Sequence, residues 1–392
     1  MFKSHNPTIL QVIPQLRSGG AEKTAIDVAK AVMDHGWHAI VASAGGPLTE
    51  QLAEMGIDHV NLPLDSKNPV QIWRNISRLE RLIEERQVSL IHARSRAPAW
   101  SAYFAARRSG VPFVTTYHGA YSQKNKLKAI YNSVMAKGDV VIANSNWTAD
   151  LVRSRNPEAA GRLIAIPRGT DFSDFEQSAI SEDRVRSQRQ IWDVEDEKQI
   201  ILHLARITPL KDQLTIVCAL GRLRERWPNL HVVFAGDDKG HENYTNQLVE
   251  QAAKSGVRER VHFPGLCSDP AAAIAASTLV VSASRQPETF GRVAVEAAAL
   301  GKPVVVTEIG ASAETVIARN EAAASEFTGW KVPPCSPEAF ATAITEILSM
   351  GDAEASELAK RARNHVVPRF SLARMTDATI EVYRQLLLPN SP

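Results

Sequence analysis

The sequence has few cysteines and no long hydrophobic run. Its three cysteines, Cys218, Cys267 and Cys335, are far apart and lack the spacing of metal ligands. So few cysteines argue against a disulfide scaffold and are ordinary for a protein from a reducing compartment. No apolar segment approaches the roughly 18 residues that a membrane-spanning helix requires. We therefore expect no such helix.

The chain also lacks a marked excess of either charge. Its 45 lysines and arginines against 43 aspartates and glutamates leave a net charge of +2, which implies no general affinity for nucleic acid. The apolar part of residues 1–20 is short, is interrupted by Pro14 and lacks a cleavage-like end, so no signal peptide is expected. These features predict a cytoplasmic protein, with a peripheral position on the inner face of the cytoplasmic membrane left open.

Short apolar runs alternate with helix-length segments along the 392 residues. Runs that are apolar on both faces indicate parallel strands in βαβ units. The polar stretch 173–198 separates these runs into two series, so the sequence predicts an α/β protein with two Rossmann-like domains, over residues 1–175 and 176–370, and a closing helix within 371–392. The expected strands are 8–13, 38–43, 88–93, 112–117, 139–144 and 162–167, then 199–205, 230–236, 260–265, 278–283 and 303–307.

Ligands bind such sheets beyond the carboxyl ends of the strands, and candidate ligand-binding residues follow two strands of the first series. Gly19 and Gly20 open a helix, where backbone amides can approach an anion closely; a simple tight turn is the alternative. His118 ends the strand at 112–117 and suits contact with a ligand hydroxyl or phosphate. A lone histidine is more often a satisfied polar residue, so only its position favours a function.

The second series places charged residues in the same way. Arg206 and Lys211 follow the strand at 199–205, and two cations there suit a diphosphate, although surface charge is the commoner fate of such a pair. Glu288 lies in the loop after the strand at 278–283, and Glu296 lies about two turns into the next helix. Two carboxylates suit a ligand with many hydroxyls, and the helix start at Phe290-Gly291 offers amides to an anion.

Taken together, these segments resemble the retaining glycosyltransferases of family 4, which have the GT-B fold. PETFGRVAVEAAALGKPVVVT (287–307) is similar to the E-x7-E signature of that family. The similarity covers essentially the whole chain. It extends to the Gly-Gly loop, TYHG (116–119), IPRGTDFSDF (166–175), Arg206 with Lys211, FAGDDKG (234–240) and HFPGLCSDP (262–270).

The resemblance implies an architecture. In that family two Rossmann-like domains face each other across a cleft. Residues 1–175 would bind the acceptor, residues 176–370 would bind the nucleotide sugar, and the C-terminal helix would return to the first domain.

The resemblance also implies roles for the site residues. Glu296 would bind the ribose and Glu288 the hydroxyls of the donor sugar, with the amides of Phe290 and Gly291 on sugar or phosphate. Arg206 and Lys211 would neutralise the diphosphate, Gly19 and Gly20 would close over it, and His118 would contact the sugar near the reacting centre. Because arginine, lysine and helix dipole would stabilise the leaving group, no metal and no cofactor are expected.

Three positions depart from the usual pattern of the family. His118 is followed by Gly119 where the family often has aspartate, and Lys211 is followed by Asp212 where it often has glycine. Arg168 replaces the asparagine of a Pro-Asn-Gly sequence. None of these changes removes a residue that carries one of the implied roles.

Basic residues suggest an acidic acceptor. Arg94 and Arg96 follow a strand, and Lys124 lies in a second basic segment after His118. A phosphorylated or carboxylated glycolipid would suit them, and the overall pattern resembles bacterial lipopolysaccharide-core and envelope glycosyltransferases. The segment 71–110 also contains a helical stripe with arginines nearby, and the sequence leaves open whether it contacts an anionic membrane or packs as an ordinary helix. The stripe is Ile72, Ile76, Leu79 and Ile83.

We therefore expect a retaining hexosyltransferase with a UDP- or GDP-linked donor and an acidic envelope glycolipid or lipopolysaccharide-core acceptor. Two alternatives stay open. A GT-B epimerase would release a new nucleotide sugar without any acceptor, and a non-catalytic protein would only bind the nucleotide sugar.

Overall fold

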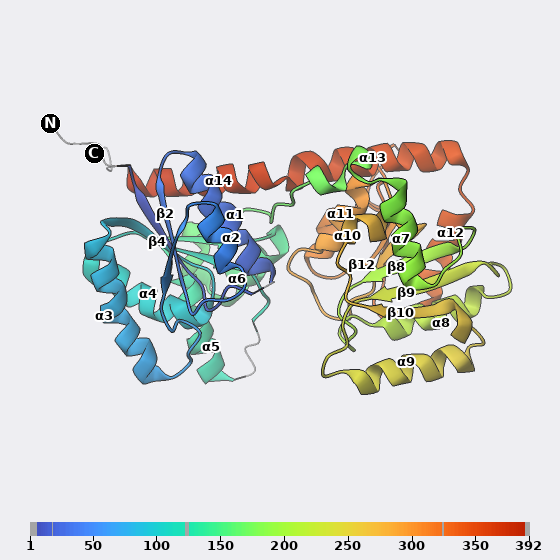
Figure 1. Cartoon of the computed structure of the whole chain (residues 1–392), viewed down its shortest axis with the longest axis horizontal. Coiled ribbons are helices and arrows are strands. Elements are labelled where there is room, and N and C mark those ends of the chain that lie inside the picture. The colour runs from blue at the N-terminus through green and yellow to red at the C-terminus, as the bar shows by residue number, and fades with distance from the viewer. Residues whose placement is uncertain (1–5, 18, 122–124, 324, 389–392) are drawn as a thin grey trace. The chain divides into compact units, whose positions relative to one another are not determined.

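The computed structural model describes residues 6–17, 19–121, 125–323 and 325–388 (Figure 1). These residues divide into two compact units: the chain leaves the first after Gly169, forms the second, and rejoins the first at Leu372. The first boundary between the two units lies after residue 169, whereas the sequence predicted it after residue 175. Phe172 and Phe175 explain the difference, because both are buried in the hydrophobic core of the second unit.

Within the described residues, the first unit is built on a seven-stranded parallel sheet of order β3-β2-β1-β4-β5-β6-β7. Its strands are β1 (Thr8–Val12), β2 (His38–Ser43), β3 (Asp58–Asn61), β4 (Val88–Ala93), β5 (Phe113–Tyr117), β6 (Val140–Ala143) and β7 (Leu163–Ala165). Its helices are α1 (Gly20–Asp34), α2 (Thr49–Glu54), α3 (Pro69–Glu85), α4 (Arg96–Ser109), α5 (Lys126–Ser133), α6 (Asn146–Arg155) and α14 (Leu372–Leu387), with 3-10 turns η1 (Val134–Ala136) and η2 (Pro157–Arg162).

The second unit has, in its described part, a six-stranded parallel sheet of order β10-β9-β8-β11-β12-β13. Its strands are β8 (Gln199–Leu204), β9 (Leu230–Ala235), β10 (Val261–Gly265), β11 (Leu279–Ser282), β12 (Val304–Thr307) and β13 (Trp330–Val332). Its helices are α7 (Glu182–Trp192), α8 (Gln213–Leu223), α9 (Glu242–Lys254), α10 (Pro270–Ala276), α11 (Arg292–Ala299), α12 (Pro337–Leu348) and α13 (Asp352–Phe370). Short 3-10 turns are η3 (Ser173–Phe175), η4 (Gln177–Ala179), η5 (Arg258–Arg260) and η6 (Ala311–Thr315).

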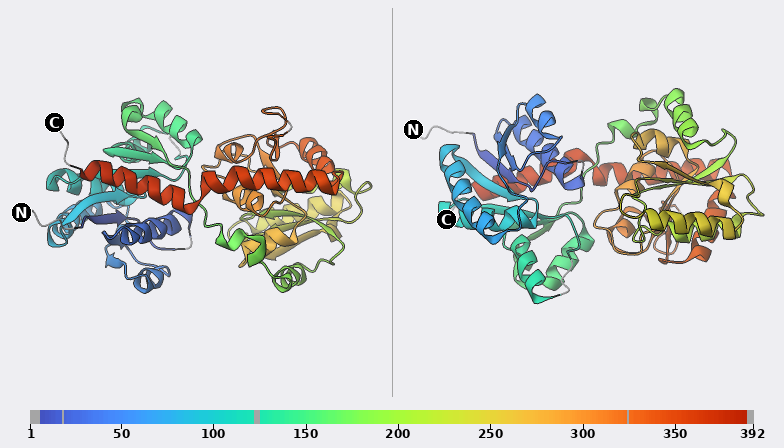
Figure 2. Two further views of the ribbon diagram at one scale, coloured as in Figure 1. Left: turned by 90° about the horizontal axis from the view of Figure 1, so that it is seen from above. Right: turned by 60° about the horizontal axis from the view of Figure 1, so that its bottom comes forward.

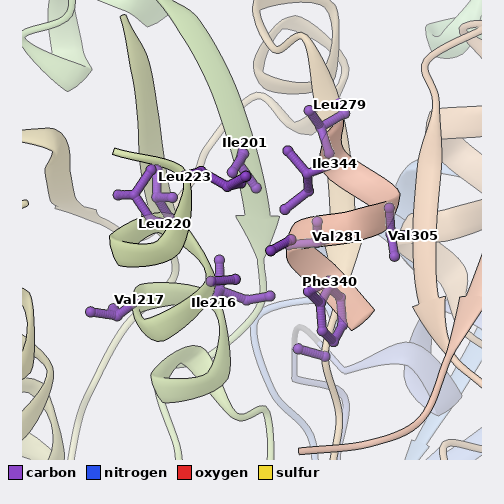
Figure 3. Close-up of a cluster of buried hydrophobic side chains, with 14 of the residues drawn as sticks. Ile201, Ile216, Val217, Leu220, Leu223, Leu279, Val281, Val305, Phe340 and Ile344 are labelled. Carbon is purple, nitrogen blue, oxygen red and sulfur yellow. The ribbon is translucent and has the colours of Figure 1, made fainter. Parts of the chain in front are cut away.

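Both faces of each sheet are covered, because successive side chains of a strand point to opposite faces. In β1, Leu10 contributes to a core with α3 and α4, whereas Ile9 contributes to a core with α1 and α14. In β8, Ile201 packs with α8 and α12, and Ile200 packs on the other face with α10 and α11. Figure 3 shows the first of these second-unit cores, formed by the strands and the helices α8 and α12. This double burial explains why the strands read as continuous apolar runs.

The two Rossmann-like domains predicted from the sequence are confirmed. The strands that the sequence did not indicate, β3 and β13, are both short and lie at sheet edges. The outer residues of β3, Asp58 and Asn61, are exposed, so this strand does not read as an apolar run. β13 has only three residues, and the middle one, Lys331, is charged, so this strand does not read as an apolar run either.

The C-terminal helix α14 packs on α1 and β4 of the first unit, beside α1 in Figure 2. Tyr383 is fully buried there, and its hydroxyl group is hydrogen-bonded to Nδ1 of His92 in β4. The other ring nitrogen of His92 lies 2.7 Å from Oγ1 of Thr116 in β5. The return of the last helix to the first domain is therefore part of the fold.

The apolar stripe of α3 belongs to the core. Ile76, Leu79 and Ile83 are buried against the first sheet. Of the two alternatives, membrane contact or ordinary packing, this burial favours ordinary packing of the stripe. In the part of the chain that the structure describes, no helix combines the length and the apolar character needed to cross a bilayer.

Candidate functional site

The strand order of the second sheet reverses direction between β8 and β11, which lie side by side at its centre. The connections from these two strands leave in opposite directions, so a crevice opens beyond their carboxyl ends. Arg206 and Lys211 follow β8, whereas Glu288 follows β11. Three residues singled out in the sequence thus follow the strands where this fold places its ligands.

Lys211 and Glu288 form an ion pair, with Nζ donating to Oε1 over 2.7 Å. The hydroxyl group of Ser284 donates to the same carboxylate oxygen. Burial raises the pKa of the Glu288 carboxyl, but the charge of Lys211 and the hydrogen bonds from Lys211 and Ser284 outweigh burial and lower that pKa. The carboxylate is therefore ionised at neutral pH and ready to accept hydrogen bonds from hydroxyl groups.

The loop that carries Glu288 is held by the backbone. The backbone oxygen of Glu288 accepts a hydrogen bond from the amide of Ala311 at 2.8 Å. Gly310 pairs with Glu288 and has a φ of 69°, and a Cβ atom on it would lie 2.6 Å from the backbone of Glu288. Only glycine fits this contact without strain, because L-residues rarely adopt that φ.

Glu296 lies in α11, where it is only 3% exposed. Its Oε1 forms an ion pair with Nε of Arg292, one helical turn earlier, at 2.9 Å. Gly291 caps this helix with a φ of 80°, and a Cβ atom there would lie 2.8 Å from the backbone of Ser312. The preceding Phe290 is buried and packs edge-on against Phe370 at 5.5 Å between ring centroids. Its side chain thus anchors the start of the helix.

The departure at Asp212 has a structural explanation. Asp212 has a φ of 54°, in the left-handed region that glycine adopts most readily and that aspartate tolerates. Its buried carboxylate accepts a hydrogen bond from the hydroxyl of Thr215 at 2.7 Å and lies 3.7 Å from Nε of Arg285. Asp212 therefore adopts the backbone conformation that glycine favours, in the turn that presents Lys211.

Beneath this turn, Nε2 of His203 lies 3.1 Å from the backbone oxygen of Lys211. Burial and the charge of Lys211 lower the pKa of His203 to about 4, so the ring is neutral at pH 7. The side chain of Arg206 is exposed, and its backbone oxygen accepts a hydrogen bond from Gln213. Arg206 thus remains accessible at the surface while Lys211 is held in place.

In the first sheet the strand order reverses between β1 and β4. Gly19 is the N-cap of α1 after β1, and its backbone oxygen accepts from the amide of Lys23. The guanidinium of Arg168 lies directly against Gly20, where a Cβ atom would come within 2.2 Å of Nη1. The carboxylate of Glu22 approaches Gly19 just as closely. The Gly-Gly step is therefore in contact with one cationic and one anionic side chain.

A small cavity lies at the carboxyl ends of β4, β5 and β6, with about 10 Å³ accessible to a water-sized sphere. Arg94 is buried, and its Nε donates to Oε1 of Gln11 at 2.8 Å. Its Nη2 has no hydrogen-bond partner among the described residues. The cavity is lined by Thr24, Arg94, Thr116, His118, Ile142, Asn144, Ile166, Arg168, Met375 and Thr379.

This cavity has two cationic side chains and no carboxylate in its lining. Burial and the charges of Arg94 and Arg168 lower the pKa of His118 well below its usual value, so His118 is neutral at pH 7. A neutral imidazole can accept or donate a hydrogen bond, whereas the two guanidinium groups can only donate. The arrangement is chemically suited to an anionic oxygen.

The other basic residues proposed for the acceptor are placed differently. Nη1 of Arg96 donates to Oδ1 of Asn132 at 2.9 Å, and its guanidinium lies 4.2 Å from the ring centroid of Tyr121. Arg96 does not line the described cavity. Lys124 lies outside the described residues.

Several residues of these sites were not found from the sequence. Arg292 could have been found, because it precedes Glu296 by four residues on a helix. Ser284 gave no signal beyond its position at the end of a strand. The contribution of Thr379 to the cavity depends on the packing of α14, which no local pattern reveals.

Comparisons with known proteins agree with this architecture. The family model for "Glycosyl transferases group 1" matches residues 185–365, and that for "Glycosyltransferase Family 4" matches residues 18–174. A glycosyltransferase of known structure from Rickettsia africae is 34% identical, with a TM-score of 0.89 over 98% of this chain and 100% of that one. HepE from Anabaena, crystallised with UDP and glucose, has the same fold at 22% identity, with a TM-score of 0.80 over 97% of this chain and 100% of its own.

Among proteins of assigned activity, a D-inositol 3-phosphate glycosyltransferase from Salinispora tropica is 29% identical over 75% of this chain. The matched region spans 63% of that relative's length. These similarities and the paired sheets define the chain as a glycosyltransferase with the GT-B fold. It belongs to the family 4 glycosyltransferases.

Proposed function

We propose that this glycosyltransferase transfers a hexose from a nucleotide-diphosphate sugar to a hydroxyl group of an acidic envelope glycolipid or lipopolysaccharide-core acceptor, with retention of the anomeric configuration. The observation that carries the donor assignment is the Lys211–Glu288 pair at the switch point of the second sheet. It combines a cation for a diphosphate with a carboxylate for sugar hydroxyls. The presence of UDP and glucose in the HepE crystal supports a donor of this class.

In the proposed reaction, the second unit would stabilise the leaving nucleoside diphosphate. Lys211, the exposed Arg206 and the amides at the start of α11 supply positive charge or hydrogen-bond donors for its oxygens. Glu288 would accept from the sugar hydroxyls, and Glu296 would accept from the ribose. Because these groups can balance the developing charge, we propose that transfer needs no metal ion.

The acidic acceptor is supported by the cavity of the first unit. Nη2 of Arg94 is buried and unpaired among the described residues, and Arg168 adds a second guanidinium to the same lining. A buried cation without an acid in the lining is stabilised when a phosphate or carboxylate oxygen reaches it. The name of the Salinispora relative, which specifies an inositol phosphate, also favours an anionic acceptor.

A thermal-shift screen tests the donor. The full chain is heated with UDP-, GDP- and ADP-sugars, and the donor that binds should raise the apparent Tm by mass action. Lys211→Gln should reduce that shift, whereas Lys331→Gln, which removes a 2.6 Å ion pair with Glu321 elsewhere in the unit, should preserve it. The absence of a shift with every donor would contradict the proposed function.

Transfer itself is tested with the donor so identified. Nuclear magnetic resonance of the first-formed glycoside reports whether the anomeric configuration is retained, and the same reaction in excess chelator tests the independence from metal. Arg94→Gln should raise KM for acidic acceptors more than KM for the donor, because its guanidinium lines the cavity assigned to the acceptor. An equal preference of the wild type for neutral and acidic acceptors would contradict the acceptor assignment.

A further inference from the structure

Two cations of the second unit lie on the short turn between β8 and α8. Residues 206–211, which we call the cationic turn, begin with Arg206 and end with Lys211. A nucleoside diphosphate spreads its charge over two phosphate groups, so two cations neutralise it together only when their spacing is fixed. The groups that fix this spacing therefore determine how well the turn accepts a diphosphate.

Two buried side chains bind the two ends of the cationic turn. Nε2 of His203, in β8, lies 3.1 Å from the backbone oxygen of Lys211. Because a carbonyl oxygen only accepts hydrogen bonds, this nitrogen carries the proton and donates it to the bond. Nε2 of Gln213, the first residue of α8, donates to the backbone oxygen of Arg206 at 3.0 Å. The side chain before the turn thus binds its last residue, and the side chain after the turn binds its first residue.

Backbone hydrogen bonds hold the middle of the cationic turn. The amide of Ile207 donates to the backbone oxygen of Asp237, in the loop after β9, at 2.9 Å. The amide of Arg285, in the loop after β11, donates to the backbone oxygen of Leu210 at 2.9 Å. These bonds use main-chain atoms, so many sequences could form them. The bonds at the two ends, in contrast, depend on the identity of two side chains.

Burial of these two side chains lowers the stability of the unit. His203 is 1% exposed and Gln213 is 0% exposed. Among the described residues, neither Nδ1 of His203 nor Oε1 of Gln213 has a hydrogen-bond partner, and both atoms are buried. A buried polar atom without a partner is destabilising, whereas apolar side chains of similar size would avoid this loss. Polar residues that break the rules of core packing in this way are typical of functional sites.

We propose that His203 and Gln213 are positioning residues, which set the spacing of Arg206 and Lys211 for a diphosphate group. His203 acts through the backbone of Lys211, and Gln213 acts through the backbone of Arg206. Both side chains are buried, so neither reaches the diphosphate itself. The proposal rests on the proposed function, because it requires that a nucleoside diphosphate binds to the second unit.

The preference for a nucleoside diphosphate over the corresponding monophosphate tests the proposal. Isothermal titration calorimetry of the full chain gives Kd for UDP, UMP, GDP and GMP, and the wild type should bind one of the diphosphates more tightly than its monophosphate. His203→Leu and Gln213→Met should each lower that preference about tenfold, because a displaced cation no longer meets the second phosphate group. A general loosening of the unit would instead weaken both nucleotides alike.

Two further variants separate the hydrogen bonds from packing. His203→Gln keeps a donor near the position of Nε2 and should restore most of the preference. Ser277→Ala is the matched control, because the buried hydroxyl of Ser277 also donates to a backbone oxygen of the second unit, that of Ile274, at 2.8 Å. Ser277 precedes β11, at the end of that strand opposite to Glu288, so its variant should keep the wild-type preference.

Hydrogen exchange measures the turn without any nucleotide. The amide of Lys211 donates to the backbone oxygen of Thr208 at 2.9 Å within the cationic turn. His203→Leu should speed exchange in peptides that cover the turn, because one of its ends is released. Peptides that cover β12, which is not adjacent to β8 in the sheet, should exchange as in the wild type.

The outcomes distinguish this proposal from the proposed function. An unchanged preference in both His203→Leu and Gln213→Met would overturn the positioning role and leave the proposed function intact. Equal losses in His203→Leu and His203→Gln would also overturn it, because the packing of the ring and not its hydrogen bond would then be responsible. If the wild type bound none of the four nucleotides, the proposed function and the positioning role would be refuted together.

Discussion

Lys211 and Glu288 hold each other in place, since Nζ of the lysine donates to Oε1 of the glutamate at 2.7 Å across the loops after β8 and β11. Both side chains are partly buried, with 29% and 24% of their surface exposed. The pair therefore fixes a cation and a carboxylate beyond the carboxyl ends of β8 and β11 before any ligand binds. A preformed arrangement of this kind costs no reorganisation during the reaction.

The first prediction concerns this pair. Lys211→Gln should lower kcat by about 10²–10³-fold, the typical loss when one group that stabilises developing charge is removed. Glu288→Gln should raise KM for the donor, because the amide keeps one acceptor oxygen but loses the charge. Steady-state kinetics with saturating acceptor measure both effects.

Lys331→Gln is the control for loss of an ion pair as such, because Lys331 pairs with Glu321 away from β8 and β11. It should leave kcat within about twofold of wild type, as expected for an ion pair remote from the reacting atoms. Wild-type turnover of Lys211→Gln would refute the role assigned to the lysine.

The second prediction concerns the left-handed turn at Asp212. Asp212→Ala should destabilise the protein by about 1–2 kcal/mol, because alanine is strained at this φ and cannot accept the Thr215 hydroxyl. Asp212→Gly loses the same hydrogen bond but not the backbone preference, so it should be the more stable of the two. Thermal denaturation of the two variants measures which of them is more stable. An alanine variant at least as stable as the glycine variant would contradict the strain.

The third prediction separates two functions of one side chain. Oδ1 and Oδ2 of Asp269 accept hydrogen bonds from Arg184 at 2.8 and 2.9 Å, and Oδ1 also accepts from the amide of Ala272 at the start of α10. Asp269→Asn should cost at most about 1 kcal/mol, since the pair is a third exposed and asparagine still caps the helix. Asp269→Ala should cost about 1 kcal/mol more, because the cap is also lost.

The pH dependence of these variants checks the assignment. The hydrogen bond from Arg184 lowers the pKa of Asp269, so its stabilisation is present above the unfolded pKa of about 3.9 and is lost as the pH falls through the folded pKa. Urea denaturation at several pH values should show this acid-labile part in the wild type and not in Asp269→Asn. A pH-independent difference between them would contradict the ion pair.

The fourth prediction concerns the buried ring of His203. Its folded pKa of about 4 lies below the unfolded value of about 6.5, so the unfolded state binds the proton more readily. The stabilisation is complete above about pH 6.5 and declines as the pH falls towards 4, by about 3 kcal/mol in total. His203→Gln should reduce this pH dependence. An equal dependence of the unfolding free energy on pH in His203→Gln and wild type would contradict the low folded pKa of His203.

Much of the fold could be predicted because burial on both faces makes a parallel strand visible as an apolar run. Two of the four edge strands, β3 and β13, escape this rule. Asp58 and Asn61 of β3 face solvent, and β13 is held by only three residues from Trp330 to Val332. Their presence depends on pairing with β2 and β12, which is a tertiary property.

The site could be predicted where position along a strand decides, as for Lys211 and Glu288. Side-chain direction could not be predicted. Arg94 and Arg96 are two residues apart, yet the first enters a buried cavity and the second stacks on Tyr121. The difference arises because Arg94 directly follows β4, whereas Arg96 is the first residue of α4.

The hydrogen bond between His92 and Tyr383 joins positions 291 residues apart in the sequence. The first unit is therefore made from both ends of the chain, while the second unit is one continuous segment. During synthesis, the second unit is complete once Ser371 has left the ribosome, but the first still lacks one of the helices that cover one face of its sheet. A chain that ends before α14 therefore leaves apolar residues of that face, such as Ile9, without part of their cover, and exposed apolar surface favours aggregation.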